Sequence, residues 1–250
     1  LLQRCLQGLM AQSVDAPAFE IVVVDNDDAE SGRKTVERAH ERSDMVRYVR
    51  EPERSISAAR NRAVAESRGA YVAFIDDDET PEAVWLATLY QVLTDTGADG
   101  VLGPVLPEFA GTAPQWLVDS GLCLRESFPT GTALTTPRVM RTGNVLIRRE
   151  VFTAFLTPFD FRFGRTGGED SAFFARALGA GFRFVWCDEA IAYERVPPER
   201  QTARYHIRRA LQRGVNTAAR EPVLSRGTLK SLMAVPLYAL AIPLLLVAGK

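Results

Sequence analysis

Short apolar runs alternate along this chain with longer amphipathic stretches, and this alternation limits the possible folds most strongly. Residues 19–25, 45–49 and 71–75 have the composition of strands, whereas residues 31–43 and 55–69 have helical periodicity. Strands that alternate with helices are typical of an α/β domain. The sequence therefore predicts an α/β fold with a mostly parallel sheet flanked by helices. A length of 250 residues suits one large domain of this kind.

The first helical stretch, residues 1–12, has no strand before it. A parallel unit needs a strand on each side of its crossover helix. We therefore expect one strand of the sheet to be missing upstream of this helix. The formal net charge of −1, from 30 basic and 31 acidic residues, gives no reason to propose a nucleic acid as a partner.

The C-terminal part differs in composition, so we predict a catalytic domain over residues 1–220 and a tail over residues 221–250. Residues 231–249 carry no charge, and several arginines precede them. Such a stretch is just long enough to cross a bilayer, with the basic approach on the cytoplasmic side. We expect membrane association at the cytoplasmic face; the alternative is a buried hydrophobic helix.

Two of the expected strands end in clusters of carboxylates. The apolar run from Tyr71 leads into Asp76, Asp77, Asp78 and Glu79. The first run, residues 19–25, ends in Asp25, which Asp27 and Asp28 follow. Carboxylates this close repel one another unless a cation or a set of donors compensates them. Ligands of open α/β sheets bind outside the carboxyl ends of the strands, so both clusters are expected to face one crevice.

The second cluster has the chemistry of a metal site. Carboxylates in an Asp-x-Asp arrangement bind a hard divalent cation that keeps positions for substrate phosphates. We predict that Asp78 binds the metal, Mn²⁺ or Mg²⁺, and that Asp76 contacts a ribose hydroxyl. Thr80 and Pro81 then have the pattern of a helix N-cap and first helical residue.

A third acidic pair follows Gly167 and Gly168 at the start of an apolar helix. Asp170 has two interpretations from the residues alone, a helix N-cap or a catalytic base, and Glu169 precedes it. A cap alone does not require the Gly-Gly-Glu sequence before it.

Four motifs occur in a characteristic order: "EIVVVDNDD", "SISAARNRAVAESRGAYVAFIDDDETP", "GNVLIRREVF" and "GGEDSAFFARALGAG". Together they resemble family 2 glycosyltransferases with the GT-A fold, over nearly everything from Leu1 to about Gly214. The segment "AYERVPPERQTARYHIRRALQRG" is similar to bacterial members that assemble exopolysaccharides or other surface glycans. The implied reaction transfers a sugar, with inversion, from a nucleotide sugar such as a UDP-sugar to a glycan or lipid-linked acceptor.

The resemblance also implies roles for individual residues. The nucleotide sugar is expected to contact Asp25, Asn26, Arg60, Asn61, Asp76 and Asp77. The metal is expected on Asp78, and Glu194 stands where many relatives place a histidine near the metal. The catalytic base is expected to be Asp170, with Glu169 orienting the acceptor.

Two departures from the family pattern matter. The family's first strand is not in the sequence, and the Gln-x-x-Arg-Trp motif of processive synthases is absent. Addition of a single sugar is therefore expected rather than polymerisation. A haloacid-dehalogenase-type phosphatase needs a downstream lysine that is followed by acidic metal ligands. No acidic residue follows Lys230, so this alternative is disfavoured. A nucleotidyltransferase and a non-catalytic nucleotide-sugar-binding module remain as alternatives.

Overall fold

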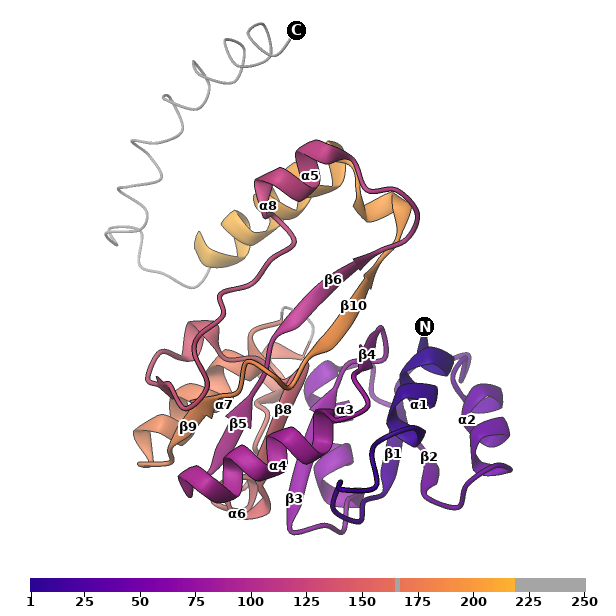
Figure 1. Ribbon diagram of the computed structural model, residues 1–250, viewed down its shortest axis with the longest axis vertical. Coiled ribbons are helices and arrows are strands. Elements are labelled where there is room, and N and C mark those ends of the chain that lie inside the picture. The colour runs from indigo at the N-terminus through magenta and orange to yellow at the C-terminus, as the bar shows by residue number, and fades with distance from the viewer. Residues whose placement is uncertain (165–166, 219–250) are drawn as a thin grey trace, which may run out of the picture. The chain divides into compact units, whose positions relative to one another are not determined.

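A computed structural model describes residues 1–164 and 167–218 of the protein (Figure 1). The chain divides into two compact units, Leu1–Pro198 and a second one that begins at Glu199. Within the second unit, the described part consists of the end of η3 (Pro198–Arg200) and helix α8 (Ala203–Ala218). The uncharged stretch 231–249 lies outside the described residues, and the boundary expected near residue 220 stays a prediction. None of the helices within the described ranges has the length and apolar character needed to span a membrane.

The first unit is built around a five-stranded sheet with the order β3-β8-β5-β9-β7. These strands are β3 (Tyr71–Ile75), β5 (Gly100–Leu102), β7 (Ala133–Leu134), β8 (Asn144–Arg148) and β9 (Phe184–Trp186). Helix α4 (Trp85–Thr96) runs along one face of this sheet (Figure 1). Helices α6 (Arg149–Thr153) and α7 (Glu169–Gly179) pack on the other face, which gives three layers.

Side chains of the central strands alternate between the two faces of the sheet, as the pleat of a strand requires. In β8, Leu146 packs with α4, whereas Val145 and Ile147 pack with the phenylalanines of α6 and α7. Strand β8 is buried along most of its length, because a helical layer covers each face. The apolar residues of β8 therefore form a central strand of the sheet. Strand β3 pairs with β8, so the residues that follow β3 lie at the edge of this core.

Strands β1 (Ile21–Asp25) and β2 (Val46–Arg50) form a second, parallel sheet. Helices α1 (Leu2–Met10) and α2 (Arg33–His40) pack with them through a core that contains Leu6, Ile21 and Val36. Helix α3 (Ile56–Glu66) leads from β2 to β3. The strand–helix–strand order predicted for residues 19–75 is confirmed.

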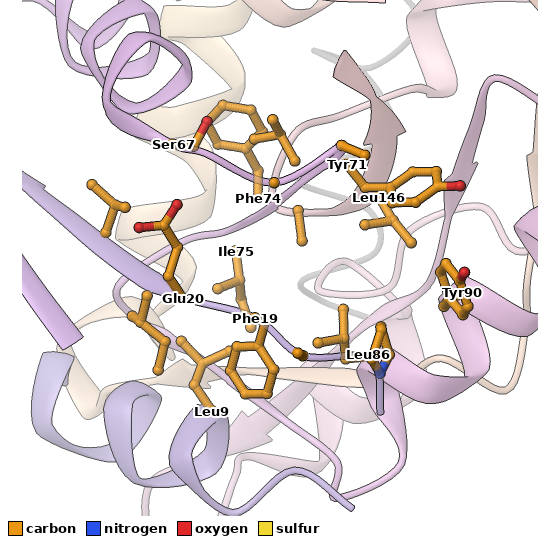
Figure 2. Close-up of a pocket in the computed structure, with 18 of the residues that line it drawn as sticks. Leu9, Phe19, Glu20, Ser67, Tyr71, Phe74, Ile75, Leu86, Tyr90 and Leu146 are labelled. Carbon is orange, nitrogen blue, oxygen red and sulfur yellow. The ribbon is translucent and has the colours of Figure 1, made fainter. Parts of the chain in front are cut away.

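An apolar cavity of ≈ 240 Å³ separates β1 from β3 (Figure 2). Residues 19–22 line one side and residues 71–75 the other, while Leu9, Leu86 and Tyr90 close the space between them. Among the described residues, β1 pairs only with β2 and β3 only with β8, so each strand has an edge toward this cavity. The unpaired edges of β1 and β3 therefore face the same apolar space.

A three-stranded sheet with the order β4-β10-β6 connects to the acidic turn. It consists of β4 (Glu79–Pro81), β6 (Val105–Phe109) and β10 (Ala192–Val196). The prediction of a helix start at Thr80 and Pro81 is therefore wrong. These residues form β4, because they pair with Ala192 and Tyr193 of β10, and α4 begins only at Trp85.

The sheets are mixed, since three strand pairings are parallel and four are antiparallel within the described residues. The α/β class is confirmed, while the expected predominance of parallel pairing is not. Insertion of β8 antiparallel between β3 and β5 accounts for two of the antiparallel pairings. Residues 104–137 contain β6, α5 (Gln115–Ser120), β7 and the start of η1 (Pro137–Val139). A further short helix, η2 (Phe161–Phe163), precedes α7.

Candidate active site

The acidic turn after β3 is closed by its own backbone. The Glu79 amide donates to the Asp76 carbonyl at 3.0 Å, and the Asp76 amide donates to Glu79 Oε2 at 3.3 Å. Glu79 is the residue of the turn that the protein buries. The turn therefore presents Asp76, Asp77 and Asp78 on a support fixed by a buried carboxylate.

Strand β10 places a further carboxylate beside this turn. Glu194 lies directly opposite Glu79 in the antiparallel pairing of β10 with β4, and the Arg195 amide donates to the Asp78 carbonyl at 3.2 Å. An arginine from the connection between α5 and β7 meets this group: Arg125 contacts Glu194 at 2.6 Å and Glu79 at 3.9 Å. The structure thus brings Glu194 next to the turn, as predicted, but in an ion pair with a side chain of this chain.

Arg60 of α3 joins the acidic turn to the second acidic pair. Its guanidinium forms a close ion pair with Glu169 and lies 3.6 Å from Asp76 Oδ1. Residues 60, 76 and 169 are far apart in the sequence, so this contact shows that the predicted donor-binding turn and the predicted base helix share one site. The predicted contact of Arg60 with the nucleotide sugar stays a prediction.

Burial and the two arginines shift the pKa values of the carboxylates in the acidic turn. Burial, with the nearby charge of Asp76, raises the pKa of Glu79 well above its usual range. Burial also raises the pKa of Asp76, and the charges of Arg60 and Arg125 oppose that rise. The Asp76 side chain is still 48% exposed, so solvent reaches its carboxylate.

Gly143, just before β8, leaves room for the carboxylates of Asp76 and Glu79. A Cβ atom at residue 143 would lie 2.8 Å from Glu79 Oε1 and 3.1 Å from Asp76 Oδ2. Any larger residue would therefore displace the carboxylates.

Helix α7 presents Glu169 and Asp170 in its first turn, where the helix dipole favours negative charge. Gly168 precedes the helix with a φ of 92°, a left-handed conformation that favours glycine. This agrees with the expectation that the glycines allow a tight approach, although the N-cap position belongs to Gly168 and not to Asp170. Glu169 Oε2 is buried and has no hydrogen-bond partner among the described residues. A buried acceptor of this kind is suited to a hydroxyl group of a ligand.

Helix α3 holds the segment that leads to α7. Asn61 binds the backbone of Phe159 through both ends of its amide, at 2.8 and 2.9 Å. Ser57 Oγ donates to the Asp160 carbonyl at 2.9 Å. Asn61 therefore has a structural task next to the site, and its predicted contact with the nucleotide sugar stays a prediction.

Asp25, at the end of β1, uses both carboxylate oxygens within its own loop. Oδ1 accepts from the Asp27 amide at 3.0 Å, and Oδ2 accepts from the Gly32 amide at 3.0 Å and from the Tyr48 hydroxyl at 3.3 Å. Asn26 donates to the Ser55 carbonyl at the start of α3 at 3.2 Å. Asn26, one of the predicted base-binding residues, is thus joined to the start of α3, the helix that carries Arg60.

The aspartates of the acidic turn have the chemistry of metal ligands. Within residues 1–164 and 167–218, no three His, Cys, Asp or Glu side chains form a group that could hold a metal ion. Nucleotide-bound Mg²⁺ takes one or two carboxylates and completes its shell with phosphate oxygens and water. The exposed Asp77 and the partly exposed Asp78 are hard oxygen donors of the required kind.

Sequence reasoning missed Arg125 and the special place of Glu79. Arg125 lies in a stretch without clear periodicity, and its partner Glu194 is 69 positions away. The available signal was the excess of carboxylates in the turn, which demands a cation from somewhere in the chain.

The family described as "Glycosyl transferase family 2" matches residues 1–157, more than half of the chain. The chain belongs to glycosyltransferase family 2. This assignment agrees with the resemblance carried by the four motifs and sets aside the nucleotidyltransferase.

Individual relatives of the family support the same fold. The chain is 34% identical over 218 residues to "Succinoglycan biosynthesis protein ExoM" of Rhizobium meliloti (strain 1021), which covers 85% of this chain and 69% of ExoM. Residues 1–349 of S. aureus TarS, in complex with UDP-GlcNAc, superpose with a TM-score of 0.61 at 18% identity, over 78% of this chain and 54% of that one. The mannosyltransferase PcManGT from Pyrobaculum calidifontis, in complex with GDP-Man and Mn²⁺, gives a TM-score of 0.60 at 19% identity, over 95% of this chain and 65% of that one. These structures show the GT-A fold, and the chain spans about two thirds or less of their lengths.

Proposed function

We propose that this protein is an inverting, metal-dependent glycosyltransferase that moves one sugar from a nucleotide-diphosphate sugar to a hydroxyl acceptor. The observation that carries the proposal is the position of Arg60 between Asp76 and Glu169. It places a cation-binding turn and a pair of carboxylates within the reach of one side chain. Inverting transfer needs both, because a diphosphate must leave while a base takes the acceptor proton.

Each residue then has a defined task. Asp170 accepts the proton of the acceptor hydroxyl as that oxygen attacks the anomeric carbon, and Glu169 accepts a hydrogen bond that orients the acceptor. Asp78, with Glu194 as a second ligand, holds the cation, which supplies Lewis-acid stabilisation of the leaving diphosphate. Asp76 and Asp77 face the ribose and diphosphate side of the donor. Asp25 and Asn26 position the loop on which the nucleobase rests.

The donor is proposed to be a UDP-sugar and the pathway the assembly of a bacterial exopolysaccharide or glycolipid. The name of the R. meliloti relative and the UDP-GlcNAc complex of TarS support this choice. PcManGT, with GDP-Man and Mn²⁺, supports the metal and keeps a guanine nucleotide as the competing donor. The uncharged stretch 231–249 supports a lipid-linked acceptor and a place at the cytoplasmic face of the membrane.

Replacement of Asp170 tests the chemistry. Asp170→Asn should abolish sugar transfer and leave the affinity for UDP with Mn²⁺ within about twofold, because the base acts on the acceptor and not on the nucleotide. Asp119→Asn, on the exposed end of α5, is the matched control and should keep full activity. Transfer is measured as UDP release with acceptor present, and binding by calorimetry.

Near-normal transfer by Asp170→Asn would remove Asp170 from the role of base. A screen of UDP- and GDP-sugars by thermal shift with Mn²⁺ would identify the donor, since a ligand that binds the folded state raises its apparent stability.

A further inference from the structure

Arg125 occupies the carboxylates that the proposed metal needs. It contacts Glu194, one predicted metal ligand, at 2.6 Å, and Glu79, next to the other ligand Asp78, at 3.9 Å. The charge of Arg125 also opposes the rise in the pKa of Asp76. A guanidinium and a divalent cation cannot both lie close to these few carboxylates without repelling one another. The acidic turn therefore has an internal counter-ion that a metal must displace at least in part.

Arg60, the other arginine beside the acidic turn, has Glu169 as its main partner. Arg60 is held against Glu169 with a side chain only 12% exposed, under the Phe159 ring. Arg125 is 34% exposed and is held chiefly by its carboxylate partners. Of the two, Arg125 is the one that can change partner at low cost.

The segment that carries Arg125 has one firmly attached end. Phe128 packs against Trp186, with ring centroids 5.6 Å apart, and the Gly131 amide donates to the Trp186 carbonyl at 2.8 Å. Before Phe128, Leu122 and Leu124 are 56% and 60% exposed. A rotation of Arg125 away from Glu194 would thus sacrifice little buried apolar surface.

The chemistry of the donor gives Arg125 its second partner. A nucleotide diphosphate brings a negative charge and oxygens that a guanidinium binds through two parallel hydrogen bonds. A cation held by Asp78 and Glu194 would neutralise Glu194 and leave the Arg125 guanidinium free to bind the phosphates.

We propose that Arg125 is an exchangeable counter-ion of the acidic turn: it pairs with Glu194, beside Glu79, in the free protein and moves to the donor diphosphate when the metal binds. The inference rests on the proposed metal-dependent function and adds to it a donor-binding residue outside the matched motifs. It predicts effects of opposite sign on two binding reactions, which a purely structural role does not produce.

The test compares Arg125→Met with the wild-type full chain by calorimetry, first with Mn²⁺ alone and then with UDP at saturating Mn²⁺. The variant should bind Mn²⁺ alone about tenfold more tightly, because the competing cation is gone. It should bind UDP with Mn²⁺ about tenfold more weakly, because a charged hydrogen bond to the diphosphate is lost. Arg125→Lys should lie between the two in both measurements.

Arg138→Met is the matched control, since Arg138 pairs with Glu126 of the same segment at 3.5 Å and is 82% exposed. It should change neither affinity, and thermal denaturation should show each variant folded.

Weaker binding of both Mn²⁺ and UDP by Arg125→Met, or no change in either, would overturn the exchange while the metal site stands. Absence of Mn²⁺ binding to the wild-type protein, with UDP affinity indifferent to Mn²⁺, would overturn the metal-dependent function and the exchange together. Asp78→Asn separates these cases, because it should lose Mn²⁺ affinity whatever Arg125 does.

Discussion

Removal of Arg60 should destabilise the fold by a predictable amount. Arg60 and Glu169 form an ion pair whose side chains are 12% and 4% exposed. Arg60→Met leaves Glu169 as a buried carboxylate without its partner, and breaking a buried pair in this way costs about 3–5 kcal/mol. Arg60 keeps some contact with water in the wild-type pair, so we expect the lower end, about 3 kcal/mol. For a domain of this size that corresponds to roughly 6–12 °C in Tm.

A double-mutant cycle isolates the pair. Arg60→Met with Glu169→Leu removes both charges together and should recover most of the loss, with a coupling free energy of about 2 kcal/mol. Arg62→Met is the control on the same helix, because Arg62 pairs with Glu66 at 2.9 Å in an exposed setting. It should cost less than about 0.5 kcal/mol.

Urea denaturation at neutral pH, followed by circular dichroism, measures the free energy of unfolding of the four proteins of the cycle and of Arg62→Met. A loss below about 1 kcal/mol in Arg60→Met, or strictly additive effects in the double variant, would show that the pair does not join α3 to α7.

Two further predictions concern stability alone. Glu79 has a raised pKa when folded, so it holds a proton at pH values where the unfolded chain, with a pKa near 4.5, has lost it. Stability must then fall as the pH rises above about 4.5, and Glu79→Gln should remove part of that fall in urea titrations; parallel pH profiles would contradict this. Gly103→Ala should lower the free energy of unfolding by about 1–3 kcal/mol, because its Cβ would lie 2.4 Å from the Ala190 carbonyl oxygen. A Cβ at Gly179 meets nothing within 4 Å, so Gly179→Ala should be neutral or stabilising. Thermal melts of both variants measure the difference.

The sequence was sufficient to predict the elements that local pattern controls. Apolar runs predicted β1, β2 and β3, and the amphipathic periodicity predicted α3, which begins after its N-cap Ser55. The position of carboxylates directly after β1 and β3 followed from the same runs. These features depend on residues close together in the chain, and a pattern can reveal them.

The start of α4 shows where local signals fail. Thr80 and Pro81 have the composition of a helix start, but pairing with β10 draws them into a strand. The first turn of α4 is satisfied instead by Gln12, whose Oε1 accepts from the Leu86 amide at 2.9 Å from 74 positions away. A local preference worth a few tenths of a kcal/mol to about 1 kcal/mol cannot compete with such tertiary contacts.

The candidate site illustrates the same division between residue identity and partner. The sequence identified Asp25, Asn61 and Glu194, yet each already has a partner in this chain: the loop of Gly32, the backbone of Phe159, and Arg125. Only the tertiary structure reveals these contacts, since they join segments that no spacing rule relates.

One helix accounts for the arrangement of all three acidic clusters. Helix α3 meets the Asp25 loop through the Ser55 carbonyl, the acidic turn and Glu169 through Arg60, and the segment before α7 through Asn61. Its own position is fixed by the buried Ala58 and Val64. A change in how α3 packs would therefore shift the nucleotide side, the metal side and the base side of the site together. The alignment of donor and base is accordingly a property of α3 packing as much as of the carboxylates that perform the chemistry.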